Sequence, residues 1–191
     1  IKNGKLYSEH FEYIFDFRTN QNFNQTVRNI SLNLDGVECI VKGNNATPLY
    51  VNNSINNMEV IANNTKFIAQ KADNINTNQV PNIIGAYINA ENSRFLFTGC
   101  DFEGTDALYV KQGRVNLNNC NLNTASGGAR TLQQTQYPFY AIGSALLLES
   151  YNSDSGCTQI NVSINGCDFE SNGASLIKMI QTSATGYSAS I

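Results

Sequence analysis

The chain has 191 residues, of which 12 are Lys or Arg and 15 are Asp or Glu, giving a formal net charge of −3. This length allows one domain with a substantial core and does not require two. No basic run is long enough to follow a phosphate backbone, so we expect no nucleic acid partner. No apolar run approaches the length of a membrane-spanning helix, so we expect no membrane span within this chain.

Asparagine is unusually common, with 29 residues, whereas Trp is absent and Pro occurs only three times. Asn forms helices poorly and enters left-handed backbone conformations easily, so this composition predicts many turns. The five cysteines contain no Cys-x-x-Cys pair, and His10 is the single histidine. These counts argue against a zinc site, and we expect neither a metal nor a cofactor.

In chain order, residues 1–31 carry only a weak strand pattern and are interpreted as a degraded first coil or an N-terminal cap, with FEYIFDF (11–17) as a possible strand. From residue 32 onward an eight-residue pattern recurs, with a pair of turn-forming residues at its centre. Side chains on either side of that pair alternate with period two, which predicts two short strands joined by a tight bend. The copies are LNLDGVEC (32–39), VIANNTKF (60–67), FLFTGCDF (95–102), VNLNNCNL (115–122) and VSINGCDF (162–169).

A further strand pattern precedes most of these copies, and we call it the first strand of each coil; the two strands of the eight-residue copy are then the second and third. It occurs as PLYVN (48–52), GAYIN (85–89), ALYVK (107–111), ALLLE (145–149) and, after the last copy, SLIKM (175–179). Three unlike strands in a constant order cannot bury their apolar faces alone, but stacked copies can. The sequence therefore predicts an all-β, parallel β-solenoid over residues 32–191, with about five to six coils of three short strands. Three insertion loops are expected, at 68–85 and 123–144 after the third strand of a coil and at 150–159 between the first and second strands.

These patterns resemble the right-handed parallel β-helix of the pectate-lyase-like superfamily, and most of all the β-helix repeat regions of secreted or surface adhesin-like proteins. The resemblance covers residues 32–180 and implies a secreted or cell-surface location. The superfamily includes polysaccharide lyases, hydrolases, adhesin-like proteins and phage tail proteins. The resemblance is thus specific for the fold and not for an activity.

Two sets of side chains occupy repeated positions near the bend. Cys100, Cys120 and Cys167 share one position, which Val37 and Thr65 fill in other coils, so we expect an inward column of small buried side chains. Cys157, in a loop, is expected to be the more exposed thiol, and the sequence leaves the redox state of the cysteines open. Asp101 and Asp168 follow the column, with Asn121 between them, and are expected to point outward. They are interpreted as a solvated face or, alternatively, as the carboxylate pair of an inverting glycosidase.

The first strand of each coil carries the candidate binding surface. If Leu108 and Val110 point inward, the opposite face presents a stripe of Tyr50, Tyr87, Tyr109, Leu147 and Ile177, with Asn52, Asn89, Lys111 and Glu149 alongside. In the enzymes that the chain resembles, substrate lies along this face, between loops from the corner after the third strand. We expect a carbohydrate to bind there, or else these loops to cover the tyrosines as a second core. The candidate ligand-binding residues are Tyr50, Tyr87, Tyr109, Lys111, Arg130, Tyr137 and Tyr140.

The resemblance implies, for an enzyme, clustered acids with an Arg or Lys base, or several neighbouring Asp residues. The stripe offers one acid, Glu149, and one base, Lys111, which does not obviously supply the two tuned groups of general acid–base catalysis. The leading hypothesis is a non-catalytic stalk or a carbohydrate-binding, adhesin-like segment that contacts a glycan or a host-surface ligand. The alternative is a polysaccharide lyase or glycoside hydrolase that uses Asp101 and Asp168, or Glu149 with Lys111. A further alternative is a phage receptor-binding segment, which would form trimers.

Overall fold

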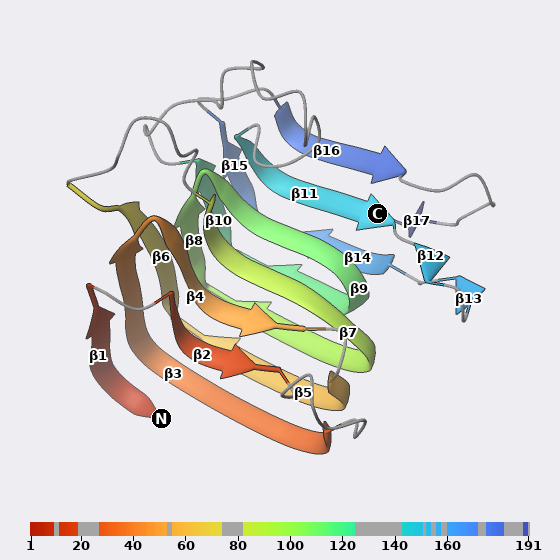
Figure 1. Ribbon diagram of the computed structural model, residues 1–191, viewed down its shortest axis with the longest axis horizontal. Helices are drawn as coiled ribbons and strands as arrows, with labels where there is room; N and C mark the ends of the chain where they lie inside the picture. Colours follow the sequence, from red (N-terminus) through yellow and green to blue (C-terminus); the bar gives the residue numbers. More distant parts are fainter. Residues whose placement is uncertain are drawn as a thin grey trace.

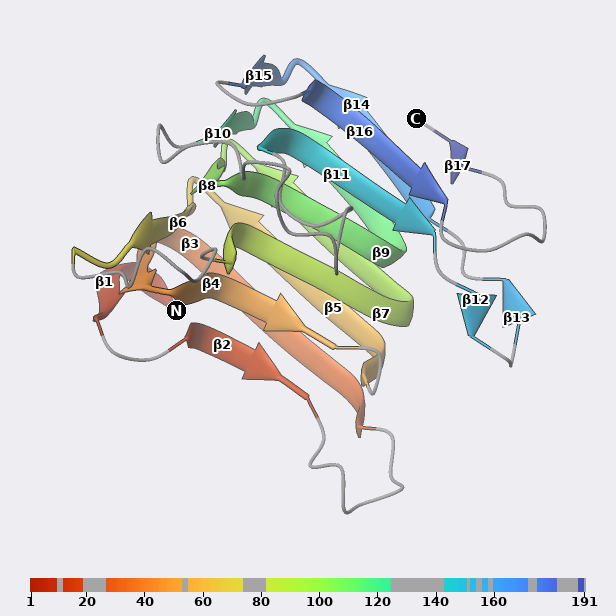
Figure 2. The same ribbon diagram turned by 45° about the horizontal axis from the view of Figure 1, so that its top comes forward.

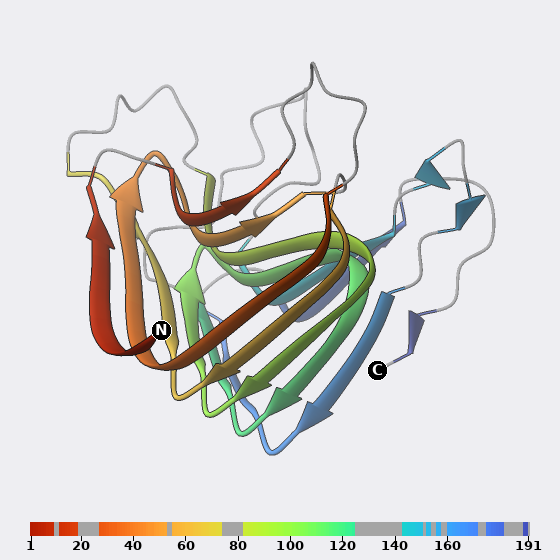
Figure 3. The ribbon, with the colours of Figure 1, turned by 90° about the horizontal axis from the view of Figure 1, so that it is seen from below.

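The computed structural model of the chain describes residues 1–9, 12–18, 27–52, 55–73, 82–124, 143–150, 152–153, 156–157, 160–171, 175–181 and 189–190. All regular elements in this part of the chain are β-strands (Figure 1). Apart from one short antiparallel pair, they pair in parallel and wind around one axis, so the fold is a right-handed parallel β-helix, as the sequence predicts. Figure 3 shows the successive coils one behind another with their bends aligned.

Each coil contributes to three stacks of strands, which we call the first-, second- and third-strand faces. The first-strand face contains β2 (Tyr13–Phe17), β4 (Asn45–Val51), the beginnings of β7 (Asn82–Thr98) and β9 (Asp106–Asn118), β11 (Ser144–Ser150) and β16 (Ser175–Gln181). The second-strand face contains the first part of β3 (Val27–Gly43), β5 (Ile55–Asn63), the ends of β7 and β9, β14 (Ile160–Asn165) and β17 (Ala189–Ser190). The third-strand face contains β1 (Lys2–Ser8), the end of β3, β6 (Lys66–Lys71), β8 (Asp101–Gly104), β10 (Asn121–Thr124) and β15 (Asp168–Glu170).

The strands are longer and less separate than the sequence pattern predicts. Strand β3 continues through a bend, and β7 and β9 each pass from the first-strand face to the second. Within residues 1–31, β1 and β2 pair in parallel with β3 and β4. The eight-residue copies align in register, since Leu32 pairs with Val60, Val60 with Phe95, and Phe95 with Val115.

Three segments were expected to be insertions. Of residues 68–85, β6 includes 68–71 and β7 includes 82–85, while 74–81 lie outside the described residues. Strand β10 extends to Thr124 and β11 begins at Ser144, and 125–142 between them lie outside the described residues. Within 150–159 a two-residue antiparallel pair forms between β12 (Asn152–Ser153) and β13 (Gly156–Cys157).

Inward-facing side chains from all three faces fill the centre of the coils. In the central strands, such as β5 and β6, alternate residues are buried, as period-two patterning requires. Phe67, Phe97 and Phe102 form one aromatic cluster, with centroid distances of 5.2 Å between Phe67 and Phe102 and 5.0 Å between Phe97 and Phe102. Such pairs add to the free energy gained by burying their area.

The cysteine column is part of this core, which confirms the sequence interpretation. Cys100 and Cys120 are fully buried and Cys167 is half-buried, and all three are free thiols. The backbone N–H of Cys120 donates to Cys167 Sγ at 3.3 Å, which joins two coils. Burial raises the pKa of Cys39, a further core thiol, to about 12, so this side chain behaves as a small apolar group. The side chain of Cys157 lies outside the described residues.

At the bend between the second and third strands, the residue with positive φ alternates between Asn and Gly from one coil to the next. The residue with positive φ is Asn3, then Gly36, Asn64, Gly99, Asn119 and Gly166 in successive coils, with φ between 47° and 62°. Only Gly and Asn enter this region at low cost, which explains the turn pairs seen in the sequence. The bend at Asn3 is a sixth copy that the sequence pattern did not reveal.

Each Asn of the bend fills the space that the Gly of the next coil leaves open. A Cβ atom placed on Gly99 would lie 2.8 Å from Asn64 Oδ1, and one on Gly166 would lie 2.5 Å from Asn119 Oδ1. A second Asn in place of Gly99 or Gly166 would therefore put its Cβ atom against the side chain of Asn64 or Asn119. The alternation allows the coils to stack at the spacing of parallel strands.

We expect Gly99→Ala to lower the free energy of unfolding by about 1–3 kcal/mol, because it adds both a strained φ and a clash with Asn64. Gly4→Ala is the matched control, since a Cβ there would have its nearest neighbour at 4.0 Å. Chemical denaturation measures both. In an Asn64→Gly background the cost of Gly99→Ala should fall, and equal costs in the two backgrounds would contradict the clash.

Candidate functional site

The outer side of the first-strand face carries a continuous column of large side chains. Tyr50 pairs with Tyr87, Tyr87 with Tyr109, and Tyr109 with Leu147. These residues point outward because their strand neighbours Leu49, Val51, Leu108 and Val110 are buried in the centre of the coils. We call Tyr50, Tyr87, Tyr109 and Leu147 the tyrosine ladder, and Figure 2 shows the strands that carry it side by side.

The last member expected for this column is wrong by one residue. Leu147 pairs with Lys178, whereas Ile177 pairs with the inward-facing Leu146. The phrase SLIKM is apolar at several consecutive positions, so its pattern does not fix which residues face outward. The register column that contains the ladder thus continues from Leu147 to a cation, Lys178, and not to Ile177.

The tyrosine rings contact one another along the axis. The centroids of Tyr50 and Tyr87 are 5.0 Å apart in a stacked arrangement, and those of Tyr87 and Tyr109 are 5.0 Å apart in an edge-to-face arrangement. Tyr13 extends the row, with its centroid 4.7 Å from that of Tyr50, and the Arg18 guanidinium lies 5.1 Å from the Tyr13 centroid. Stacking engages the faces of Tyr50 and Tyr87 with each other, so the ladder offers ring edges and hydroxyl groups outward.

Polar side chains two residues after each ladder position hold the rings. Asn52 Nδ2 donates to the Tyr50 hydroxyl at 3.1 Å, and Asn89 Nδ2 donates to the Tyr87 hydroxyl at 3.4 Å. Lys111 Nζ lies 5.9 Å from the Tyr109 centroid. The register shifts here, because Ile88 pairs with Val110 while Asn89 pairs with Gln112, which leaves Lys111 in a β-bulge.

The ladder is accessible to solvent at one end, which we call open, and buried at the other, which we call closed. Tyr50 and Tyr87 are half-buried, whereas Tyr109 is 4% exposed and Leu147 is fully buried. Tyr109 and Leu147 form an apolar cluster with Ile84 on the outside of the sheet, against which Tyr87 packs. The Tyr109 hydroxyl is buried and has no hydrogen-bond partner among the described residues. A ligand from solvent can therefore reach Tyr50 and Tyr87 but not Tyr109.

Lys111 and Glu149, the base and the acid predicted on this face, form a buried ion pair. Lys111 Nζ lies 3.3 Å from Glu149 Oε2, and the Glu149 side chain is 3% exposed. Burial disfavours charge on both groups: it raises the pKa of Glu149 to about 7 and lowers the pKa of Lys111. The pair connects β9 with β11 directly beside the closed end of the ladder.

Asp101 and Asp168 lie on the third-strand face, away from this ion pair. Both pair with Asn121, which lies between them, and Asn121 Nδ2 donates to Asp101 Oδ1 at 2.7 Å. They belong to a column whose charges alternate at its beginning: Lys5, Glu38, Lys66, Asp101, Asn121 and Asp168. Lys66 Nζ lies 3.3 Å from Glu38 Oε1. The structure therefore does not bring the two candidate catalytic pairs together.

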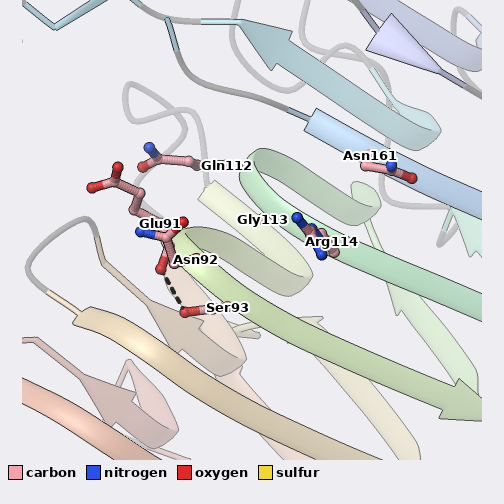
Figure 4. Close-up of a pocket in the computed structure, with 7 residues that line it drawn as sticks. All are labelled: Glu91, Asn92, Ser93, Gln112, Gly113, Arg114 and Asn161. Atoms are coloured by element: carbon pink, nitrogen blue, oxygen red, sulfur yellow. Dashed lines mark hydrogen bonds between the residues drawn. The ribbon is translucent and has the colours of Figure 1, made fainter. Parts of the chain in front are cut away.

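A polar cleft of about 270 Å³ adjoins the ladder at the corner between the first- and second-strand faces (Figure 4). Gln112, which lines the cleft, pairs with Asn89, whose side chain donates to the Tyr87 hydroxyl. The backbone of Asn92 and Gly113 has positive φ, and Ser93 Oγ donates to Glu91 O and accepts from Met58 N, both at 2.9 Å. The cleft is lined by Glu91, Asn92, Ser93, Gln112, Gly113, Arg114 and Asn161.

Sequence reasoning missed this cleft, although two signals for it exist. The segments Glu91–Ser93 and Gln112–Arg114 both interrupt the period-two pattern, and each contains a residue suited to positive φ. A Cβ atom on Gly113 would lie 3.1 Å from Ala90 O and 3.3 Å from Phe95 Cε2, so this position requires glycine. The Glu91 carboxylate and the Arg114 guanidinium are exposed, and neither forms an ion pair with a described residue.

Arg130, Tyr137 and Tyr140, the loop residues expected to wall the binding surface, lie outside the described residues. Among the residues that the structure describes, no group of three or more His, Cys, Asp or Glu side chains is placed to hold a metal ion.

Comparisons with models of protein families, with curated proteins and with solved structures give no match. The described part of the chain has no helix of the length and hydropathy needed to cross a bilayer. What the fold and its outer faces define is thus a structural class: a parallel β-helix domain with an aromatic ladder and an adjoining polar cleft.

The raised pKa of Glu149 gives a testable pH dependence. A carboxyl group that holds its proton more tightly in the folded state stabilises the fold most below pH 4.5, its ordinary pKa, and this contribution is lost as pH rises through about 7. The change is about 3 kcal/mol in unfolding free energy. Glu149→Gln, and the double replacement Lys111→Met with Glu149→Gln, should flatten this slope in denaturation experiments.

The control for that measurement is Glu103→Gln, which removes a half-buried carboxylate from the third-strand face. It should keep the pH slope of the parent protein. An unchanged slope in both Glu149 variants would show that this carboxyl group ionises normally in the fold.

Proposed function

We propose that this chain is a non-catalytic β-helix domain of a secreted or cell-surface protein, and that it binds carbohydrate. The proposed site is the open end of the tyrosine ladder together with the polar cleft. The observation that carries the proposal is their continuity, since Asn89, which donates to Tyr87, pairs with Gln112, which lines the cleft. A chain of sugar rings needs an elongated surface with many hydrogen-bonding groups, and this region supplies one.

The chemistry of the surface fits a polyhydroxylated ligand. The cleft presents the side-chain amides of Asn92, Gln112 and Asn161, each of which offers donors and an acceptor. Arg114 adds a cation that could meet a sugar carboxylate with paired hydrogen bonds. The hydroxyl groups of Tyr50 and Tyr87 continue this row of hydrogen-bonding groups along the axis. Only a small part of such a ligand would be enclosed, which suits recognition of a long polymer.

The rigid scaffold supports an adhesin-like or stalk role. The resemblance of the repeat pattern to surface-exposed β-helix proteins favours the same location. The sequence-based candidate Tyr109 fits this proposal as a support for Tyr87 and not as a direct contact, because it is buried.

We expect the protein to bind a subset of glycans on an array, and Tyr87→Ala to weaken that binding about tenfold through loss of ladder contacts. Tyr7→Ala is the matched control, because Tyr7 is an exposed tyrosine on β1, outside the ladder. Arg114→Ala should weaken binding only to glycans that carry a carboxylate. An array without any bound glycan would leave a structural stalk as the function.

A polysaccharide lyase or glycoside hydrolase is the second candidate, and the pKa of Glu149 near 7 beside Lys111 is the observation that favours it. Release of reducing ends from plant or mucin polysaccharides, abolished by Glu149→Gln, would replace the binding proposal. Loss of that release in Asp168→Asn would point instead to the carboxylates of the third-strand face.

A further inference from the structure

A column of asparagines runs along the corner between the first- and second-strand faces and ends at the polar cleft. Strand pairing places Asn29, Asn57 and Asn92 at one position of successive coils, and we call them the corner asparagines. All three have positive φ, of 61°, 56° and 50°. Asn57 Nδ2 donates to Asn29 Oδ1 at 2.5 Å, so the side-chain amides of the first two members are joined.

The next coil has no fourth corner asparagine, because β9 turns the same corner with fewer residues. In the strand pairing, only Gly113 of β9 lies opposite residues 90–93 of β7. Glycine has no side chain to continue the column, so Asn92 has no counterpart in the coil of β9. The polar cleft occupies this place, since Asn92, Gln112 and Gly113 all line it (Figure 4).

The amide of Asn92 is available to a ligand. Asn92 is exposed, and its side chain forms no hydrogen bond with another described residue. The neighbouring Ser93 hydroxyl is already engaged, because it donates to Glu91 O and accepts from Met58 N. An Asn amide offers N–H donors and a carbonyl acceptor, which match the carbonyl oxygen and the N–H of a second amide. An amide of a ligand can therefore take the place of the missing corner asparagine.

We propose that the cleft binds the acetamido group of an N-acetylated sugar, which extends the column of corner asparagines by one amide. The inference rests on the proposed function, because it names the class of glycan that binds there. Asn92 Nδ2 donates to the carbonyl oxygen of the acetamido group, and Asn92 Oδ1 accepts its N–H. The cleft volume of about 270 Å³ accommodates this group with part of its sugar ring. A hydroxyl group at the same ring position is shorter and has no carbonyl oxygen, so it leaves the Asn92 amide unpaired.

Calorimetric titration of the full chain with three tetrasaccharides of one β-1,4-linked backbone tests the acetamido group. Chitotetraose carries acetamido groups, its fully de-acetylated form carries amines at the same positions, and cellotetraose carries hydroxyl groups. Chitotetraose should bind about tenfold more tightly than either of the others.

The outcomes separate this inference from the proposed function. Equal affinity for the three tetrasaccharides overturns the role of the acetamido group and leaves carbohydrate binding in place. Absence of binding to all three also overturns it, and a glycan without acetamido groups that binds on an array would then still support the proposed function. An array without any bound glycan overturns both.

Replacement of the corner asparagine tests the contact itself. Asn92→Gly removes the amide and keeps a residue suited to positive φ, so it should lower the affinity for chitotetraose about tenfold and leave that for cellotetraose unchanged. Asn29→Gly is the matched control, because Asn29 has the same backbone conformation at the same corner but does not line the cleft. It should bind both tetrasaccharides as the parent protein does. Equal losses in the two variants would overturn the assigned contact, and circular dichroism establishes that each variant is folded.

Discussion

The whole structure depends on parallel pairing between the same positions of successive coils. In-register pairing brings each side chain against its counterpart in the next coil at about 4.8 Å, so neighbours in a column must tolerate or attract each other. Phe67 on Phe102, Glu38 on Lys66 and Asn64 on Gly99 are three solutions to this requirement. The repeat in the sequence follows from these columns. The residue types found at one position of the repeat are those that the side chains of the neighbouring coils can accommodate.

The candidate site follows from the same rule applied to an outward column. Tyrosines at one position of consecutive coils must contact each other, and their asparagine partners fix the hydroxyl groups. Where the column changes to Leu147, the polar partners change too, to the buried pair of Lys111 and Glu149. In-register stacking therefore orders the tyrosine rings. It also turns the faces of Tyr50 and Tyr87 toward each other, so these faces are not available to stack on a sugar ring.

Much of the fold could be read from the sequence, because the turn pair and the period-two pattern repeat wherever the chain forms a regular coil. The cysteine column and the outward direction of Tyr50, Tyr87 and Tyr109 follow directly from that pattern. Ile177 was misplaced because SLIKM is almost uniformly apolar, and the bulge at Lys111 has no local signature. The cleft at Gly113 escaped notice because it forms where two strands turn a corner, and the pattern is interrupted there.

The alternation of Asn and Gly at the bend has a consequence for how such a solenoid can change in length. Its chemical period is two coils, although its structural period is one. Loss of a single coil would bring Asn against Asn or Gly against Gly at the new junction, whereas loss or duplication of two coils would preserve every neighbour relation. Solenoids built with this bend should therefore lengthen and shorten in pairs of coils.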